Sequence, residues 1–301
     1  MRNSSHRKIR EILKLPSDCM TDILVIDQLP QGVVDIYCDV NAIASELRIP
    51  YLVVGATARD LILYHGFGAL IERGTRDIDF GIKVRTWEDF HNMSAGLVAK
   101  GFEQDLQVKH RFHRDDADGL PWDIDIVPFG FAEQSTEIAW PPHGDIVMTI
   151  LGFAEALEHA IQVQIADDTR INICAPAAMA ALKLVAWAER DPAIRQKDAA
   201  DLLYLIKSYS KIPVVNDSLY DDGFMERRDY DEHLAAAEKL GADMFAIMSQ
   251  ATRSFLYSQI FSQLTVLDAL TRHMKLTSHE PWDRCLELVD TFIAGTRLNA
   301  G

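Results

Sequence analysis

The chain has 301 residues, of which 48% are hydrophobic and 25% are charged, a composition typical of a soluble globular protein with one or two domains. No apolar run approaches the roughly 18–20 residues that a membrane helix needs, so no membrane span is predicted. The formal net charge of −15 argues against a protein that coats nucleic acid non-specifically, although it is compatible with a local basic groove.

The first 20 residues are a predicted basic N-terminal arm, with five basic and two acidic side chains. This segment lacks the apolar core and the small-residue cleavage site of a secretory signal. The four cysteines have no paired spacing, so we expect reduced thiols and a cytoplasmic protein with no membrane association. These cysteines are Cys19, Cys38, Cys174 and Cys285.

Helices and strands alternate in the first half of the chain. The apolar spacing predicts, in chain order, a helix over 31–48, a strand over 52–54, a helix over about 57–64, a strand over 78–84 and a helix over 86–100. Short strands are then predicted at 107–112, 122–127, 146–150, 161–165 and 170–174. This order is typical of an α+β domain built around a mixed sheet.

The second part of the chain reads as helical from Pro176 onward, a residue that suits the first turn of a helix. Helices are predicted at 177–188, 197–209, 228–240, 245–264 and 281–294, with a loop at 215–223. The expected fold class is therefore α+β, with a mixed β-sheet flanked by helices and followed by a helical C-terminal region. We expect one domain over 21–175 and a second over 176–301.

A glycine turn follows the strand at 52–54, in the run Gly55-Ala56-Thr57-Ala58-Arg59-Asp60. Gly55 permits a tight turn, and the exposed amides at the start of the next helix favour phosphate oxygens. Thr57 adds a hydroxyl donor. Because Thr57-x-x-Asp60 also matches a helix capping box, a structural role and a phosphate-binding role are both open.

Two pairs of aspartates lie on separate predicted strands. Asp77 and Asp79 stand one residue apart, and so do Asp123 and Asp125. Each pair presents both carboxylates on one face of its strand, where they repel each other unless a cation lies between them. If the two strands are neighbours, three or four carboxylates converge, which suits Mg²⁺ held by aspartates and by substrate phosphates. The simpler alternative is that each pair faces solvent on a strand or a turn.

Lys183 is the only charged residue between Arg170 and Glu189, so its helix is expected to be largely buried. A buried lysine needs an anionic partner, and either a nucleotide phosphate or Asp198 meets that need. Asp198 and Asp201 share a helix face, from which they orient Lys183 or lie near the metal.

Two other polar or aromatic stretches have simpler interpretations. The run from His110 to Arg114 matches no zinc signature and is expected to be a polar loop that supplies a basic edge to the cleft. Trp140 is best explained by packing or a turn, with a platform for a nucleobase as the alternative.

In this order, the motifs resemble those of the DNA polymerase β-like nucleotidyltransferase superfamily, and within it the AbiEii/AbiGii-type family of toxin nucleotidyltransferases. The resemblance covers about residues 50–205, and Ala56 stands where the family usually has a second glycine. The Gly55-x-x-x-Arg59-Asp60 turn is also similar to that of tRNA CCA-adding enzymes. The matching segments are 55–58, 75–80, and Lys183, Ala186, Arg190, Lys197, Asp198, Asp201 and Leu202.

The resemblance implies Mg²⁺-dependent transfer of a nucleoside monophosphate from an NTP to an acceptor hydroxyl, with Mn²⁺ as an alternative ion. It gives the catalytic and metal-binding roles to Asp77, Asp79 and Asp125. Residues 21–175 would be the catalytic domain, and 176–301 would complete the nucleotide site and shape the acceptor side. Nucleotide binding is assigned to Gly55, Ala56, Thr57, Arg59, Lys183 and Asp198.

The resemblance leaves the acceptor open between tRNA and a small hydroxylated molecule such as an aminoglycoside. It also implies an antitoxin protein as a partner. A protein that binds NTP without turnover, as a regulator, is the alternative from a different functional class.

Overall fold

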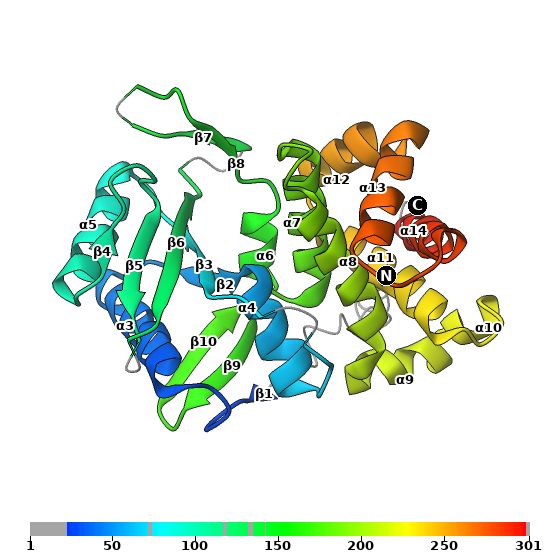
Figure 1. Cartoon of the computed structure of the whole chain (residues 1–301), viewed down its shortest axis with the longest axis horizontal. Helices are drawn as coiled ribbons and strands as arrows, with labels where there is room; N and C mark the ends of the chain where they lie inside the picture. The colour runs from blue at the N-terminus through cyan, green and yellow to red at the C-terminus, as the bar shows by residue number, and fades with distance from the viewer. Residues whose placement is uncertain (1–22, 72–73, 117–118, 132–134, 142, 299–301) are drawn as a thin grey trace, which may run out of the picture.

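The computed structural model describes residues 23–71, 74–116, 119–131, 135–141 and 143–298. Within these residues, an eight-stranded mixed sheet forms the left part of the molecule in Figure 1. The predicted basic arm, residues 1–20, lies outside the described residues. The strand order is β1-β9-β10-β2-β3-β6-β5-β4. These strands are β1 (Ile23–Leu24), β2 (Tyr51–Val54), β3 (Asp77–Lys83), β4 (Glu103–Gln104), β5 (Arg111–Asp115), β6 (Pro121–Phe129), β9 (Ile161–Ala166) and β10 (Thr169–Ile173).

Helices alternate with the strands of the sheet along the chain, and a two-stranded hairpin extends from the sheet. The hairpin pairs β7 (Glu137–Ala139) with β8 (Val147–Thr149) in antiparallel fashion. The helices in this part are α3 (Gln31–Leu47), α4 (Gly55–Asp60), the π-helical turn η1 (Leu61–Gly66), α5 (Trp87–Ala99) and α6 (Phe153–Glu158).

The remainder of the described chain is helical and forms the right part of the molecule in Figure 1. The fold is thus the expected α+β class with a helical C-terminal region. The elements are α7 (Pro176–Glu189), α8 (Gln196–Ser208), the 3₁₀ turn η2 (Tyr209–Lys211), α9 (Pro213–Asp221), α10 (Phe224–Arg227), α11 (Glu232–Ile247), α12 (Gln250–Leu256), the π-helical turn η3 (Tyr257–Phe261), α13 (Leu264–Leu276) and α14 (Trp282–Thr296).

Strand β3 shows how the two faces of the sheet differ. Ile78, Phe80 and Ile82 are fully buried, and the Phe80 ring lies 5.9 Å from the ring of Tyr37 on α3. Asp77 and Asp79 therefore face the opposite side, because alternate side chains point to opposite faces. On that side a Cβ at Gly81 would lie 2.8 Å from the Phe153 ring of α6, so glycine is needed for this close packing. One face of β3 is apolar core, and the other carries its carboxylates.

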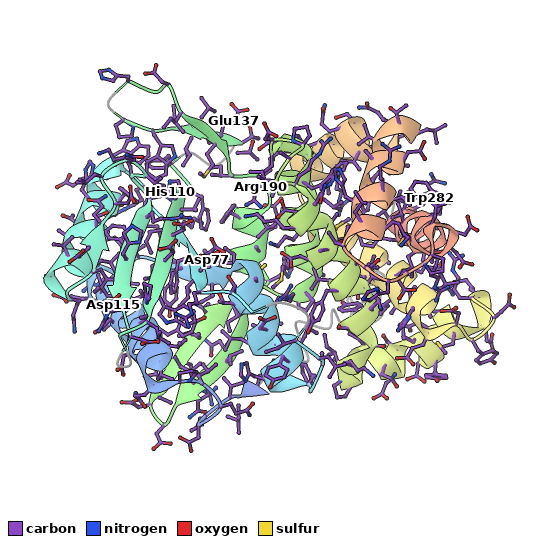
Figure 2. The ribbon with its side chains drawn as sticks, in the orientation of Figure 1. Asp77, His110, Asp115, Glu137, Arg190 and Trp282 are labelled. Atoms are coloured by element: carbon purple, nitrogen blue, oxygen red, sulfur yellow. The ribbon has the colours of Figure 1, made fainter. Side chains whose placement is uncertain are left out.

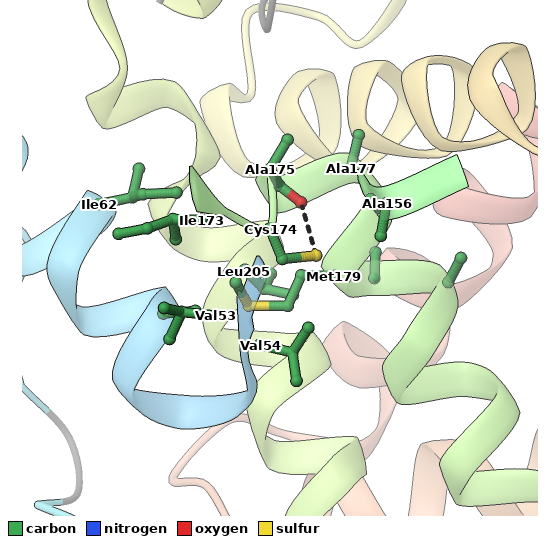
Figure 3. Packing of buried hydrophobic residues seen from close by; sticks show 14 of the residues in the cluster. Val53, Val54, Ile62, Ala156, Ile173, Cys174, Ala175, Ala177, Met179 and Leu205 are labelled. Atoms are coloured by element: carbon green, nitrogen blue, oxygen red, sulfur yellow. Dashed lines mark hydrogen bonds between the residues drawn. The ribbon is translucent and has the colours of Figure 1, made fainter. Parts of the chain in front are cut away.

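The sheet joins the helices through apolar packing, seen at close range in Figure 3. Val53 of β2 and Ile173 of β10 lie in the same buried cluster as Met179 of α7 and Leu205 of α8. Cys174 is buried beside them as a free thiol that donates to the carbonyl oxygen of Ala175 at 3.6 Å. The change from strands to helices occurs between β10 and α7, at the predicted place, and the apolar core continues across it. The division into two domains stays a prediction.

Three predicted elements were wrong. The expected loop at 215–223 belongs to helix α9, which starts at Pro213 and buries Val215 and Leu219 one turn apart. The expected helix at 245–264 is interrupted, because the Ser249 side chain caps the new helix α12 by accepting from the Thr252 amide at 3.3 Å. The strand at 107–112 begins only at Arg111, so the expected polar loop from His110 to Arg114 is largely strand β5.

None of the helices in the described part of the chain is long and apolar enough to cross a membrane.

Candidate active site

The glycine turn and the first aspartate pair meet at the end of strand β2. Val54 stands opposite Asp79 in the antiparallel β2–β3 ladder, and the chain turns at Gly55 with a φ of +78°. A Cβ on Gly55 would lie 2.1 Å from Oδ2 of Asp79. The position therefore requires glycine for two reasons, a left-handed backbone and the close approach of the carboxylate.

The two aspartate pairs lie side by side, which was the condition for their carboxylates to converge. Strands β3 and β6 are parallel neighbours, with Asp77 opposite Asp123 and Asp79 opposite Asp125. Because opposite residues on neighbouring strands point to the same face, four carboxylates share one patch of the sheet.

Strand β5 places two basic side chains on the same patch. Arg111 stands opposite Asp125 and binds it through two hydrogen bonds of 2.8 Å each, with Asp123 at 3.4 Å. His113 contacts Asp123 through Nδ1 at 2.8 Å and Asp105 through Nε2 at 3.0 Å, and these bonds raise the pKa of His113. The sequence predicted a basic edge to the cleft from this segment, but not the pairing of Arg111 with Asp125 or of His113 with Asp123. The alternation of Arg111 and His113 around the fully buried Phe112 was the available signal.

At Asp79, burial and neighbouring carboxylates outweigh the effect of the nearby cations. Its pKa is raised to about 6, first because it is buried and also because of Asp125 and Asp77, while Lys183 and Arg190 act in the opposite direction. The repulsion between the carboxylates fits a site that is completed by a cation.

The oxygen donors of this patch suit Mg²⁺, which is commonly bound by one or two carboxylates together with substrate phosphates. Asp77 and Asp79 can supply those carboxylates. The Asp125 carboxylate is held by Arg111, and within the described residues no three candidate ligands converge as a ready-made metal site. The residues thus fit a metal that arrives with a nucleotide and not a closed cage of protein ligands.

A cavity of about 360 Å³ separates the carboxylates from the helices. Gly55, Asp79 and Asp125 line it from the sheet, and Lys183 and Arg190 line it from the helical side. Figure 2 shows Arg190 across from His110, below the hairpin that carries Glu137. The walls between these charged ends are largely apolar and include Val54, Val127, Val147, Met148, Leu151, Phe153, Met179, Leu182, Val185 and Ala186.

The helical side of the cavity carries a closed set of ion pairs. Nζ of Lys183 lies 2.6 Å from Asp201 and 3.6 Å from Asp198. Arg190 Nη1 lies 2.7 Å from both carboxylate oxygens of Asp198. The predicted pairing of Lys183 with Asp198 is present, but Asp201 is the nearer partner because Arg190 occupies Asp198.

The remaining residues of the glycine turn lie beside the cavity and do not line it. Ala56 and Thr57 are buried in helix α4. Arg59 is also buried, at 3% exposure, and it bridges Asp60 at 2.7 Å and Asp201 while its guanidinium lies 4.5 Å from the centre of the Tyr204 ring. Arg59 therefore connects α4 to α8.

The hairpin closes one side of the cavity through a contact that the sequence did not reveal. Thr149 of β8 donates to Oε1 of Glu189, the last residue of α7, at 2.5 Å, and both residues line the cavity. His110 lines the same cavity from the sheet side. A larger open groove of about 670 Å³ runs along α14 and contains none of the predicted site residues.

The solved structures that the chain matches include an antibiotic-resistance factor, an antibiotic adenylyltransferase and a CCA-adding enzyme. The antibiotic-resistance factor ANT(2'')-Ia is 17% identical with a TM-score of 0.37, and the match covers 67% of this chain and 98% of that one. The lincosamide antibiotic adenylyltransferase LnuA is 14% identical with a TM-score of 0.36, covering 59% of this chain and 96% of that one. The CCA-adding enzyme of Thermotoga maritima in complex with tRNA is 11% identical with a TM-score of 0.23, covering 90% and 82%.

No curated protein matches the chain. A comparison with protein families matches residues 40–278 to the family described as "Nucleotidyl transferase AbiEii toxin, Type IV TA system". The match includes the glycine turn, both aspartate pairs and the ion pairs of α7 and α8. The chain therefore belongs to the AbiEii nucleotidyltransferase family.

Proposed function

We propose that this nucleotidyltransferase moves a nucleoside monophosphate from a Mg²⁺-bound NTP to a hydroxyl group of an acceptor. The observation that supports this most is the register of β3 and β6, which puts Asp77 beside Asp123 and Asp79 beside Asp125. Asp79 and Asp125 line a cavity whose far wall carries Lys183 and Arg190. The arrangement provides negative charge for a metal and positive charge for a triphosphate at opposite ends of one space.

Asp77 and Asp79 would hold Mg²⁺, or Mn²⁺ in its place, and Asp125 would complete the metal site. The ion would bring the triphosphate and the acceptor oxygen together and neutralise the negative charge that develops on the leaving group. Gly55 supports this role because it leaves room for the Asp79 carboxylate, with which a Cβ at this position would collide.

The other side chains of the cavity would position the two substrates. Lys183 and Arg190 would bind triphosphate oxygens, and Arg59 would act through Asp201 to orient Lys183. Arg111 would fix Asp125, which accepts the proton of the attacking hydroxyl. The acceptor oxygen then bonds to the α-phosphorus while the bond from that phosphorus to its bridging oxygen breaks, and pyrophosphate leaves.

The assay uses each labelled NTP with Mg²⁺ and either total tRNA, a pool of small hydroxylated molecules, or the protein alone. We expect pyrophosphate release and label on one acceptor class, with tRNA favoured by the toxin family and an aminoglycoside-like molecule as the alternative. Asp77→Asn should abolish transfer while the circular dichroism spectrum stays unchanged. NTP binding without turnover in the wild type would instead identify a regulator, and full activity of Asp77→Asn would contradict the proposed site.

An antitoxin partner is the further expectation from the toxin family. We expect induced expression of the wild type to arrest growth and the Asp77→Asn variant to be harmless. Equal toxicity of the two proteins would separate any toxic effect from nucleotidyl transfer.

A further inference from the structure

His113 lies at the outer end of the carboxylate patch, between two neighbouring strands of the sheet. It stands opposite Glu103 in the β4–β5 ladder and opposite Asp123 in the β5–β6 ladder. Because opposite residues on neighbouring strands point to the same face, His113 shares a face with the four aspartates of β3 and β6. No step of the proposed reaction uses this histidine.

Both ring nitrogens of His113 contact carboxylates. Nδ1 lies 2.8 Å from Oδ1 of Asp123, and Nε2 lies 3.0 Å from Oδ2 of Asp105. An ionised carboxylate only accepts hydrogen bonds, so both nitrogens donate and the ring is positively charged. The hydrogen bonds to Asp105 and then to Asp123 raise the pKa of His113 for the same reason. His113 is thus a cation held between two carboxylates.

The outer partner, Asp105, is fixed by the backbone of the β4–β5 turn. Its Oδ1 accepts from the amides of Gln107 at 2.7 Å and Val108 at 2.8 Å. Its own amide donates to the carbonyl oxygen of Arg111 at 2.9 Å. The other carboxylate oxygen, Oδ2, is left for His113. The orientation of the imidazole is therefore set from the surface of the molecule, by groups that do not line the cavity.

The inner partner, Asp123, connects His113 to Arg111. Its Oδ1 takes the bond from His113, and its Oδ2 lies 3.4 Å from Nη1 of Arg111. Arg111 in turn binds Asp125 through two hydrogen bonds of 2.8 Å each. Both oxygens of Asp123 are therefore next to cations. Asp77, which stands opposite Asp123 on β3, forms no ion pair with the residues that the structure describes.

This contrast divides the opposed carboxylates by role. Asp77 is available to a metal ion, whereas Asp123 is occupied by two protein cations. Without His113, Asp123 would have one free oxygen beside Asp77. It would then be attracted to the metal, or would compete with Asp125 for Arg111, because an unneutralised carboxylate is stabilised by the nearest positive charge.

We propose that His113 is a positioning residue of the transfer site, which holds Asp123 away from the metal so that Arg111 keeps its two bonds to Asp125. This proposal rests on the proposed nucleotidyl transfer. His113 acts through Asp123 and Arg111 and contacts neither the substrates nor the metal. Its loss should therefore have opposite effects on metal affinity and on catalysis.

The binding test measures the affinity of the protein for Mn²⁺ alone, without NTP, from the electron paramagnetic resonance signal of the free ion. His113→Phe frees Asp123 and removes a positive charge, so we expect Mn²⁺ to bind about fivefold more tightly than to the wild type. His113→Asn keeps an N–H donor near the position of Nδ1, so its affinity should lie between the two. An affinity of His113→Phe that equals or falls below the wild-type value would overturn the proposal.

The activity test separates kcat from nucleotide binding. We expect His113→Phe to lower kcat about tenfold, as the loss of an outer hydrogen-bond partner typically does. The Kd for a fluorescent NTP, measured without metal, should stay unchanged because Lys183 and Arg190 are untouched. His113→Asn should recover most of the lost rate. The matched control is Glu103→Gln, which removes a charge opposite His113 on the side away from Asp123 and should change neither value.

Urea unfolding checks that each variant is folded. An unchanged kcat in His113→Phe, an equal loss of kcat and NTP affinity, or a His113→Asn protein no better than His113→Phe would each overturn the positioning role. A wild type that binds Mn²⁺ but transfers nothing would contradict the proposed function and leave the Mn²⁺ affinities to decide on His113. A wild type that binds no Mn²⁺ would overturn both.

Discussion

Two groups of charged side chains face each other across the cavity that Asp79 and Lys183 line, and they differ in charge balance. On the sheet, Asp77, Asp79, Asp123 and Asp125 share a face with Arg111 and His113. On the helical side the contacting groups are three cations and three carboxylates, namely Arg59, Lys183 and Arg190 with Asp60, Asp198 and Asp201.

This difference in charge balance indicates different roles for the two groups. In a paired network, removing one member leaves its partner without that counter-charge. On the sheet the carboxylates outnumber the cations, and the pKa of Asp79 is raised first by burial and then by Asp125 and Asp77, against the effect of Lys183 and Arg190. The balanced group therefore connects α7 and α8 to the glycine turn, with Lys183 and Arg190 also lining the cavity, and the unbalanced group is the proposed site of the cation.

Replacement of Asp79 tests the unbalanced group and should have the largest effect. Asp79→Asn removes a metal ligand and should lower the rate of pyrophosphate release on the order of 1000-fold. It also removes a repelling buried charge, so the midpoint of thermal unfolding at pH 8 should rise. The sign follows from the raised pKa, because the ionised form of Asp79 opposes folding above its ordinary pKa.

The outcome that contradicts this prediction is a variant that is less stable and still active, measured by calorimetry and a coupled pyrophosphate assay. Such a result would mean that Asp79 is a structural carboxylate like those on the helical side.

Replacement of Arg59 tests the balanced group, with a large expected effect on stability. Arg59→Met leaves Asp60 and Asp201 without their shared cation and should lower the free energy of unfolding by about 3 kcal/mol. Arg59→Lys keeps the charge but loses the forked geometry, so it should be intermediate. Urea unfolding measures both variants. A large fall in the NTP affinity of the folded Arg59→Lys protein, with wild-type stability, would instead place Arg59 on the triphosphate.

Replacement of Gly55 tests the contact between the two groups. Gly55 is the first residue of α4, the helix that carries Arg59, and it lies against Asp79. Gly55→Ala should lower activity about 100-fold, since its Cβ displaces the Asp79 carboxylate, and a shift of about 1 Å at a reacting group has an effect of this size. The matched control is Gly101→Ala, which has a φ of +88° and no heavy atom within 4 Å of the added Cβ.

Both glycine variants should be destabilised by about 1–2 kcal/mol through the left-handed backbone, measured by urea unfolding. Only Gly55→Ala should lose activity. Equal activity of the two variants would mean that the close approach of Asp79 to the turn has no catalytic role.

The sequence alone predicted those parts of the site that depend on short-range rules. Strand alternation puts Asp77 and Asp79 on one face, and the same rule predicts the Asp123 and Asp125 pair once the strands are neighbours. The family's glycine turn predicted the position of Gly55 at the end of β2. These are local patterns that do not depend on the details of packing.

Contacts that depend on packing between distant segments were not predictable. The choice of Asp201 over Asp198 by Lys183 follows from Arg190, which reaches Asp198 from beyond the end of α7. The strand that contains Arg111 was predicted over 107–112 but lies at Arg111–Asp115, because its charged residues conceal the buried Phe112. Helix faces and strand registers limit such partners to a few candidates, and the three-dimensional packing selects among them.

A third group of charged residues lies on the opposite face of the same sheet, and its replacement should have the smallest effect on stability. Asp39 of α3 contacts Arg114 of β5 and lies 3.1 Å from Lys100, and these cations hold the pKa of Asp39 below its ordinary value against the effect of partial burial. The one carboxylate of this group has two cationic partners, so its replacement should lower stability, as replacements on the helical side do. The loss of stability should be smaller because Lys100 is half exposed.

Asp39→Asn should therefore lower the free energy of unfolding at pH 7 by about 0.5–1 kcal/mol and leave nucleotidyl transfer unchanged. A carboxylate with a depressed pKa stabilises the fold above the pKa of the unfolded chain, and this contribution disappears as the pH falls through the lower pKa of the folded state. The wild type and Asp39→Asn should thus converge in stability as the pH falls well below the ordinary aspartate pKa of about 3.9, measured by urea unfolding across a pH series. A constant difference between them at every pH would show that Asp39 acts through its shape and hydrogen bonds and not through its charge.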